Sequence, residues 1–254
     1  MIQLADKVAV VTGGSRGIGA ATVELLAEAG AQVVFSYHRQ RAAALEVARG
    51  ARRSGVEAVA VRADLSRVAD ARRLIRTAVR RFRRVDILVA NAGIWNAEDI
   101  PIEKLSERDW DRMLEVNLKS VYAVVRFAVP VMKRQGGGRI IALSSTAGQR
   151  GEAFHDHYAA SKGAVISFVK GLSTELAPHG ILVNCVAPGW VDTDMARPVL
   201  RQARKRRWVE RQIPLGRVAR AKEIAGPILF LASELATFMT GEIVNVNGGS
   251  VLVG

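Results

Sequence analysis

Cysteine is almost absent from this chain of 254 residues, whose only thiol belongs to Cys185. A single cysteine excludes an internal disulfide framework and a cysteine-based zinc site. Because Cys185 lies in the apolar run at residues 181–187, we expect a buried and unreactive thiol.

Long apolar runs are also missing, since no stretch reaches the about 18 consecutive apolar residues that a transmembrane helix needs. The N-terminal sequence MIQLADKVAVVTGG lacks the basic segment and the small-residue cleavage site of a signal peptide. Both absences predict a cytoplasmic protein with no membrane contact.

Acidic residues are outnumbered, with 24 Asp and Glu against 37 Lys and Arg, which gives a formal net charge of +13. The 29 arginines and 8 lysines are spread along most of the chain without a nucleic-acid-reading motif, so we interpret the charge as compositional bias. One cluster indicates a solvated helix face and comprises Arg80, Arg81, Arg83 and Arg84. A second cluster, whose meaning the charge leaves open, comprises Arg201, Arg204, Lys205, Arg206 and Arg207.

Short apolar runs alternate with longer amphipathic segments along the whole chain. The runs predict buried strands of a parallel sheet at residues 8–12, 32–36, 58–61, 87–90, 139–143, 181–187 and 243–246. The amphipathic segments predict helices at residues 18–28, 41–54, 69–82, 160–176 and 222–231. This alternation predicts an α/β fold with a doubly wound parallel sheet, and the lack of a linker predicts a single Rossmann-like domain over residues 1–254. The long irregular stretch at residues 188–220 predicts a lid or a helical excursion.

A glycine-rich turn follows the first predicted strand and opens the first predicted helix. Glycines let such a turn tighten, so that backbone N–H groups approach a pyrophosphate at the positive helix N-terminus. The glycine spacing differs from the commonest dinucleotide fingerprint, and it is the position after the first strand that favours a cofactor site over a bare turn. The candidate contacts are Thr12, Gly13, Ser15, Arg16, Gly17, Ile18 and Gly19.

The second predicted strand leads into Tyr37 without an acidic residue. An acid at this point would hold the ribose 2′-hydroxyl of NAD and repel the 2′-phosphate of NADP. The run from Phe35 to Gln40 contains none, while Arg16 and Arg39 are placed to clamp a phosphate. The alternative interpretation is that Arg16 and Arg39 bind no phosphate and only reflect the high arginine content of the chain. NADP(H) is therefore favoured over NAD(H).

Ser145, Tyr158 and Lys162 form a second candidate constellation. Ser145 ends a predicted strand, and Tyr158 and Lys162 are one helical turn apart. A phenol has an ordinary pKa near about 10, and an ammonium one turn away is expected to lower the pKa of Tyr158 toward the working range. Taken alone, such a tyrosine–lysine pair is more often an ordinary pair on a helix surface.

The order of the motifs along the chain favours a functional role for Tyr158 and Lys162 over an ordinary pair on a helix surface. From Lys7 to Gly249 the chain resembles the short-chain dehydrogenase/reductase family, through the glycine turn, Asn91-Ala92-Gly93, Asn117, Ser145, Tyr158, Lys162 and Pro188-Gly189. Within that family it is most similar to the 3-oxoacyl-[acyl-carrier-protein] reductase group, through VDILVANAGI, YAASKGAV, APGWVDTDM and IPLGRV.

The resemblance implies a role for each matched residue. Tyr158 matches the catalytic acid/base and Ser145 the residue that orients the carbonyl. Lys162 matches the residue that lowers the pKa of the tyrosine and holds the nicotinamide ribose, and Asn117 the residue that positions a relay water. The other implied cofactor contacts are Tyr37, Arg39, Asp64, Leu65, Asn91, Ala92, Gly93, Pro188, Gly189, Val191 and Thr193. Ala90 departs from the asparagine that the family often has there, with an expected effect on local stability.

The activity implied by the resemblance is NADPH-dependent reduction of a 3-oxoacyl thioester to a secondary alcohol, without a metal. A sugar, a cyclic alcohol or a xenobiotic ketone is the alternative substrate, and a non-enzymatic cofactor sensor is the alternative class. Specificity is expected to depend on residues 95–98, 149–157 and 195–212. The family also implies a homotetramer, packed through residues 111–133 and 158–176. The second basic cluster either steers an acidic acyl carrier protein or is an exposed helix at residues 203–210.

His155 and His157 flank Asp156 and resemble part of a metal site. No third ligand has a useful spacing, and hydride transfer needs no metal. We interpret this segment as a loop that lines the substrate entrance, with two solvent-exposed histidines as the alternative.

Overall fold

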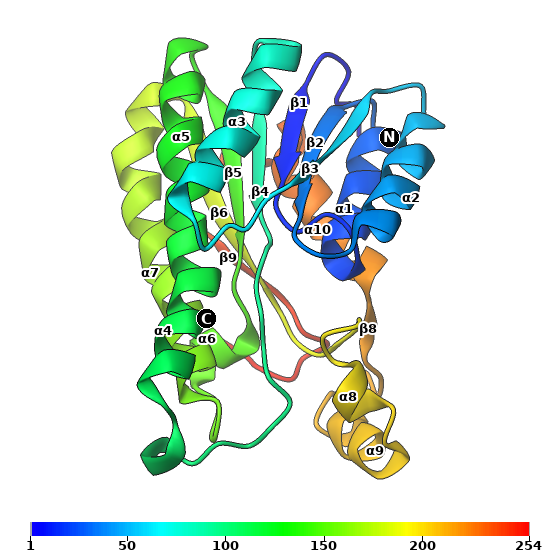
Figure 1. The fold of residues 1–254 in the computed structure, drawn as a ribbon, viewed down its shortest axis with the longest axis vertical. Helices are drawn as coiled ribbons and strands as arrows, with labels where there is room; N and C mark the ends of the chain where they lie inside the picture. Colours follow the sequence, from blue (N-terminus) through cyan, green and yellow to red (C-terminus); the bar gives the residue numbers. More distant parts are fainter. Residues whose placement is uncertain (1, 254) are drawn as a thin grey trace.

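Seven parallel strands form the central sheet in the computed structural model, which describes residues 2–253 (Figure 1). The strand order is β3-β2-β1-β4-β5-β6-β9. The bounds are β1 Val8–Val11, β2 Gln32–Tyr37, β3 Ala58–Arg62, β4 Ile87–Ala90, β5 Gly138–Leu143, β6 Ile181–Pro188 and β9 Ile243–Val246. Every predicted strand is therefore present with its ends within one residue, and the doubly wound parallel sheet is confirmed.

Helices cover both faces of the sheet, as its apolar strands require. On one face lie α1 (Gly17–Glu28), α2 (Arg41–Arg52) and α10 (Ala221–Ala232). The other face is covered by α3 (Val68–Phe82), α5 (Ser120–Arg134) and α7 (Asp156–Leu176). The helix α7 begins four residues before the amphipathic segment at residues 160–176, and it includes Tyr158, as the one-turn spacing of Tyr158 and Lys162 requires.

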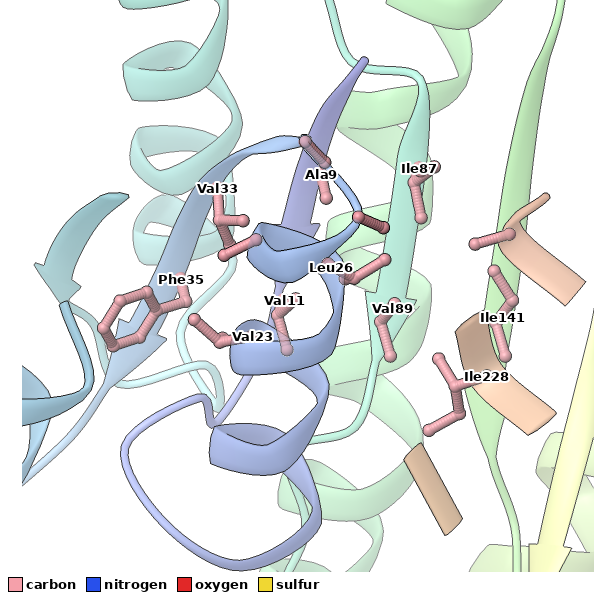
Figure 2. Close-up of a cluster of buried hydrophobic side chains, with 14 of the residues drawn as sticks. Ala9, Val11, Val23, Leu26, Val33, Phe35, Ile87, Val89, Ile141 and Ile228 are labelled. Carbon is pink, nitrogen blue, oxygen red and sulfur yellow. The ribbon is translucent and has the colours of Figure 1, made fainter. Parts of the chain in front are cut away.

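Successive residues of each strand supply opposite faces of the sheet. Ala9 and Val11 of β1 pack with Val23 and Leu26 of α1, in the cluster that Figure 2 shows. Val10, between them, belongs to the cluster on the other face. This division into two hydrophobic layers fixes the sheet between two sets of helices.

The strand order reverses at β1 and β4, which are paired in parallel through Val10 and Leu88. The chain winds from β1 through β2 to β3 in one direction, and from β4 through β5 to β6 in the other. A reversal of this kind leaves a crevice at the carboxyl ends of the two central strands. We therefore expect a ligand to bind there.

A long helical stretch before β5 combines three segments, α4 (Glu107–Leu114), a π-helical turn (Glu115–Lys119) and α5. The Ser106 hydroxyl caps α4 by accepting a hydrogen bond from the backbone N–H of Asp109. Short helical elements lie at Ile102–Lys104, Thr146–Arg150 (α6), Ala177–His179 and Glu234–Ala236. No helix among residues 2–253 is long and apolar enough to cross a membrane.

Residues 188–220, named the lid segment below, form the predicted helical excursion. Its elements are β7 (Val191–Asp192), α8 (Arg197–Leu200), α9 (Ala203–Arg211) and β8 (Ala219–Arg220), and β7 pairs in parallel with β8. Val209, Leu200 and Ile213 belong to a small hydrophobic cluster of the lid's own. Figure 1 shows α8 and α9 beyond the carboxyl ends of the central strands, on the side where α1 begins.

Candidate active site

A cavity of about 580 Å³ lies at the carboxyl ends of the central strands. Its walls come from the glycine turn, from the segments that follow β2, β3, β4, β5 and β6, and from α7. All the predicted catalytic and cofactor-contact residues line this cavity except Thr12 and Asn117. The fold thus brings together side chains that lie far apart in the sequence.

The start of α1 fits an anionic cofactor group. No side chain caps its N-terminus, so the first backbone N–H groups of the helix are available to a pyrophosphate. A Cβ atom on Gly19 would lie 2.2 Å from the carbonyl oxygen of Gly13 and 2.6 Å from Nδ2 of Asn91. The close approach of turn and helix therefore requires glycine at position 19.

Thr12 holds the glycine turn from outside the cavity. Its Oγ1 accepts hydrogen bonds from the backbone N–H groups of Asn91 (2.9 Å) and Ala92 (2.8 Å). The Asn91 side chain returns the contact by donating from Nδ2 to the carbonyl oxygen of Thr12 (2.8 Å). Thr12 does not line the cavity, and its hydroxyl ties the segment after β1 to the segment after β4, so its contact with the cofactor stays a prediction.

The part of the cavity next to β3 contains Asp64, which receives several polar contacts. Burial raises the pKa of Asp64, but hydrogen bonds from Ser66 and the charges of His38 and Arg67 outweigh it, so that the net pKa lies below the ordinary value. The Ser66 hydroxyl donates to Oδ1 of Asp64 at 2.7 Å. Asp64 is therefore an ionised acceptor at neutral pH.

The two arginines predicted to clamp a phosphate have different surroundings. Nη1 of Arg16 lies 3.5 Å from Oδ2 of Asp194 in the lid segment, and Asp194 also contacts Arg197. Arg39 is exposed and forms no ion pair within residues 2–253. Arg39 is thus free to receive an anion, whereas Arg16 connects the glycine turn to the lid.

The catalytic candidates converge from β5 and α7. Ser145 follows β5 and caps α6, with its Oγ accepting from the backbone N–H of Ala147 at 3.2 Å. Lys162 donates from Nζ to the carbonyl oxygen of Leu143 at 2.8 Å, and this ammonium lies 6.0 Å from the ring centroid of Tyr158. The contact to Leu143 fixes the ammonium below the phenol ring.

The protonation states differ from the expectation. Burial raises the pKa of Tyr158 to about 12, while hydrogen bonding with Ser145 lowers it and the charge of Glu152 raises it. The expected lowering by Lys162 is not seen, because desolvation dominates and Nζ is bound to Leu143. Burial also lowers the pKa of Lys162 to about 8. At neutral pH Tyr158 is therefore a neutral phenol, able to donate a proton, beside a Lys162 that is mostly cationic.

We expect the rate of any reaction that uses the Lys162 ammonium to fall as the pH rises through about 8. The ammonium of Lys162 is present below its pKa and is lost above it, and the role that the resemblance implies for its charge, stabilising a Tyr158 phenolate, is lost with it. The measurement is kcat against pH at saturating substrates. Lys162→Arg, which keeps the charge, is the control in which the fall disappears. A wild-type kcat that stays constant to about pH 10 would contradict this assignment.

Asn117 acts on the loop after β4 rather than facing the cavity. It lies on the π-helical turn, and its fully buried side chain accepts from the backbone N–H of Ile94 (2.7 Å) and donates to the carbonyl oxygen of Ile94 (3.0 Å). Nδ2 also lies 3.1 Å from Oγ of Ser161 on α7. A Cβ on Gly93 would contact both Oδ1 of Asn117 and Nζ of Lys162, so these two polar groups flank Gly93.

Both histidines before Tyr158 are buried, so the alternative of solvent-exposed histidines is wrong. The ring of His155 stacks on Trp95 with the centroids 5.2 Å apart, and its Nε2 and Nδ1 contact the carbonyl oxygens of Asn96 (3.1 Å) and Ala153 (3.2 Å). The rest of this loop reaches the cavity through Arg150 and Glu152. The histidines thus support the substrate side of the cavity from behind.

Four residues line the cavity near Tyr158: Trp95 and Glu152 belong to the segments expected to determine specificity, whereas Arg112 and Trp190 were not predicted. Trp190 meets Trp95 edge to face at 5.7 Å, and both indoles line the cavity together with Arg112 of α4. Burial raises the pKa of Glu152, although the charges of His155 and Arg150 lower it. The sequence indicates a place for Trp190 at the cavity only because it directly follows Pro188-Gly189, which are predicted to contact the cofactor.

Comparison with known proteins assigns the family. A model of short-chain dehydrogenases, described as Enoyl-(Acyl carrier protein) reductase, matches residues 13–250. The chain belongs to the short-chain dehydrogenase/reductase family. The 3-oxoacyl-[acyl-carrier-protein] reductase of Synechocystis sp. (strain ATCC 27184 / PCC 6803 / Kazusa) is 38% identical over 258 residues, which cover 99% of this chain and 100% of that protein. The 3-oxoacyl-[acyl-carrier-protein] reductase FabG of Aquifex aeolicus (strain VF5) is 40% identical over 251 residues, which cover 98% of this chain and 98% of that protein.

A solved structure agrees with this family assignment. The crystal structure of gox2181 has a TM-score of 0.93 to this chain at 33% sequence identity, over 98% of this chain and 96% of that one. The predicted Rossmann-like fold is confirmed. The chain is an NAD(P)-dependent oxidoreductase similar to 3-oxoacyl-[acyl-carrier-protein] reductases.

Proposed function

We propose that this enzyme uses NADPH to reduce the keto group of 3-oxoacyl thioesters to a secondary alcohol. The observation that carries the proposal is the meeting of Ser145, Tyr158 and Lys162 in one cavity with the uncapped start of α1. Relatives named 3-oxoacyl-[acyl-carrier-protein] reductase, which match nearly the whole chain, support the choice of substrate. The bound nicotinamide supplies the hydride for this chemistry.

The chain's own residues orient the carbonyl and provide the proton. The Ser145 hydroxyl holds the substrate oxygen, and the neutral phenol of Tyr158 donates a proton to it. The ammonium of Lys162 stabilises the resulting phenolate and holds the nicotinamide ribose. In this proposal Asn117 helps to position a relay water near Lys162 indirectly, through the loop after β4 that its side chain holds at Ile94.

The same proposal assigns NADPH rather than NADH as the preferred cofactor. No acidic side chain follows β2 to repel a 2′-phosphate, and the exposed guanidinium of Arg39 lines the cavity at this point. Asp64 and Leu65 lie beside it, where the adenine ring binds in the proposed arrangement. Gly189, Val191 and Thr193 enclose the nicotinamide end.

The description of the matching family model raises reduction of a carbon–carbon double bond as a second candidate. Ketone reduction is favoured because a phenol and a serine hydroxyl converge on one point, which suits a carbonyl oxygen that gains a proton. The experiment compares acetoacetyl and crotonyl thioesters, a cyclic ketone and a sugar, each with NADPH and with NADH. We expect the highest kcat/KM for acetoacetyl thioester with NADPH. A preference for the crotonyl thioester or for NADH would contradict the proposal.

The assembly of the enzyme stays a prediction. Of the small residues on α7, Ser167 and Gly171 are exposed and Ala164 is half-buried, which would let a second copy approach closely, whereas Gly163 packs against Gly148 of α6. Sedimentation at micromolar concentration tests the homotetramer that the family implies, and a species of 27.5 kDa alone would exclude it.

A further inference from the structure

A groove apart from the active-site cavity runs between α3 and α5, which pack side by side over one face of the sheet (Figure 1). Its volume is about 280 Å³, and all its walls come from these two helices. None of its residues lines the active-site cavity. This second site, named the helix groove below, therefore has no part in the chemistry proposed above.

The floor of the helix groove is apolar. Ile75 of α3 is buried in the hydrophobic core on this face of the sheet. Val79, Phe127 and Val131 are half-buried and pack against the same core. Ile75 and Val79 are one turn apart on α3, as Phe127 and Val131 are on α5, so the floor follows the facing sides of the two helices. The groove thus offers hydrocarbon surface that a bound aliphatic chain would remove from water.

Four arginines form the rim of the helix groove. Arg72, Arg76 and Arg80 follow one another at one-turn spacing along α3, and Arg134 lies in the last turn of α5. All four are exposed, and within residues 2–253 none of them forms an ion pair. The stretch from Arg72 to Arg80 covers about 12 Å of helix, so cations accompany the apolar floor along its length.

The two helices supply no carboxylate that could neutralise this rim. Asp70 is the only acidic residue of α3, and it pairs with Arg73 at 2.5 Å. The helix α5 contains no acidic residue at all. A cation in the last turn of a helix is favoured by the helix dipole, but Arg72 and Arg76 lie too early in α3 for that explanation. The rim therefore complements an anionic group of another molecule.

Size and charge together determine which kind of molecule fits the helix groove. Its volume is close to the lower limit of small-molecule sites, about 300 Å³, so it suits a slender chain better than a protein helix. A second copy packed groove to groove would bring four arginines against four others, which is unfavourable. A bilayer is contacted through projecting apolar side chains, and Tyr122, outside the groove, is the only exposed large hydrophobic residue in the described helices α3 and α5.

We propose that the helix groove binds the anion of a long-chain fatty acid that is free in solution. The aliphatic chain covers the apolar floor, and the planar guanidinium groups of the rim hold the carboxylate. Because α3 leads into β4 and α5 into β5, and these strands are parallel, the two helices run in the same direction. Arg80 and Arg134, both in last turns, thus lie at the same end of the groove, where the carboxylate binds.

The test is a calorimetric titration of the wild-type protein with three probes, each below any micelle-forming concentration. The probes are laurate, dodecyltrimethylammonium, which has the same chain with a cationic head, and acetate, which has the carboxylate without the chain. We expect laurate alone to bind. The variant Arg80→Gln, Arg134→Gln should raise the Kd for laurate at least about tenfold, with a smaller difference when salt screens the contact. The matched control, Arg204→Gln, Arg207→Gln, removes the same charge from exposed arginines of α9 and should bind laurate as the wild type does.

Several results would overturn this proposal. If the groove variant binds laurate as the wild type does and laurate competes with the thioester substrate, the laurate site is the active-site cavity. If dodecyltrimethylammonium binds as well as laurate, the arginines do not select the ligand. Vesicles of phosphatidylglycerol that sediment with the wild type but not with the groove variant, without laurate binding, would assign the groove to a membrane surface. A changed sedimentation coefficient of the groove variant would assign it to an interface between copies. The titration needs no turnover, so its outcome is separate from that of the proposed function.

Discussion

Tyr158→Phe is expected to remove nearly all turnover while the affinity for NADPH stays unchanged. The change deletes one hydroxyl and keeps the ring that packs beside Lys162. General acid catalysis contributes about 100-fold to 10,000-fold to a rate, and the loss in kcat should lie in that range. Steady-state kinetics with acetoacetyl thioester and a fluorescence titration of NADPH measure the two quantities separately.

Tyr122→Phe is the matched control for this experiment. The hydroxyl of Tyr122 lies on the outside of α5 and accepts a hydrogen bond from Nη1 of Arg126 at 2.6 Å, away from the cavity. Its loss should leave kcat close to that of the wild type. A near-native rate for Tyr158→Phe would show that another group donates the proton.

Gly19→Ala is expected to destabilise the fold and to weaken NADPH binding at the same time. The new Cβ would lie 2.2 Å from the carbonyl oxygen of Gly13, which cannot move easily because Ser36 and Asn91 hold the turn. Overpacking of this kind costs about 1–3 kcal/mol of unfolding free energy, and it outweighs the roughly 1 kcal/mol by which alanine favours a helix interior. Because the turn itself has to shift, we also expect the Kd for NADPH to rise at least about tenfold.

The control for this change is Gly50→Ala in the last turn of α2, where a new Cβ would have no atom within 4 Å. That variant should gain up to about 1 kcal/mol from helix propensity and bind NADPH as the wild type does. Denaturant unfolding and NADPH titration measure both variants. Native stability and affinity in Gly19→Ala would mean that the turn and α1 do not pack as closely as described.

The strands could be predicted because each is a short, mostly apolar run bounded by polar or glycine-rich turns. The start of α7 could be predicted only to within two residues, at Tyr158 instead of Asp156, since the residues before Tyr158 are polar and include two histidines that look like a loop. The ring of Trp95, from a distant loop, covers His155, and nothing in the sequence indicates that either histidine is buried. Contacts between residues that are far apart in the sequence leave no periodic pattern.

In the candidate site, too, some features could be predicted from the sequence and others depend on contacts between distant residues. Ser145, Tyr158 and Lys162 could be predicted because their order matches a known family, and the structure places all three on one cavity. The chemistry around them depends on burial, which the sequence does not reveal, so the expected lowering of the pKa of Tyr158 was wrong. The pairing of Arg16 with Asp194 likewise depends on how the lid segment folds back over the glycine turn.

The most direct measurement is the identity of the product that the purified wild-type enzyme forms from acetoacetyl thioester and NADPH. Mass spectrometry and proton NMR distinguish the possible products without reference to rates. The proposed function predicts a 3-hydroxybutyryl thioester, formed in an amount equal to the NADPH consumed. Unchanged acetoacetyl thioester at the end of the reaction, with no NADPH oxidised, would contradict it.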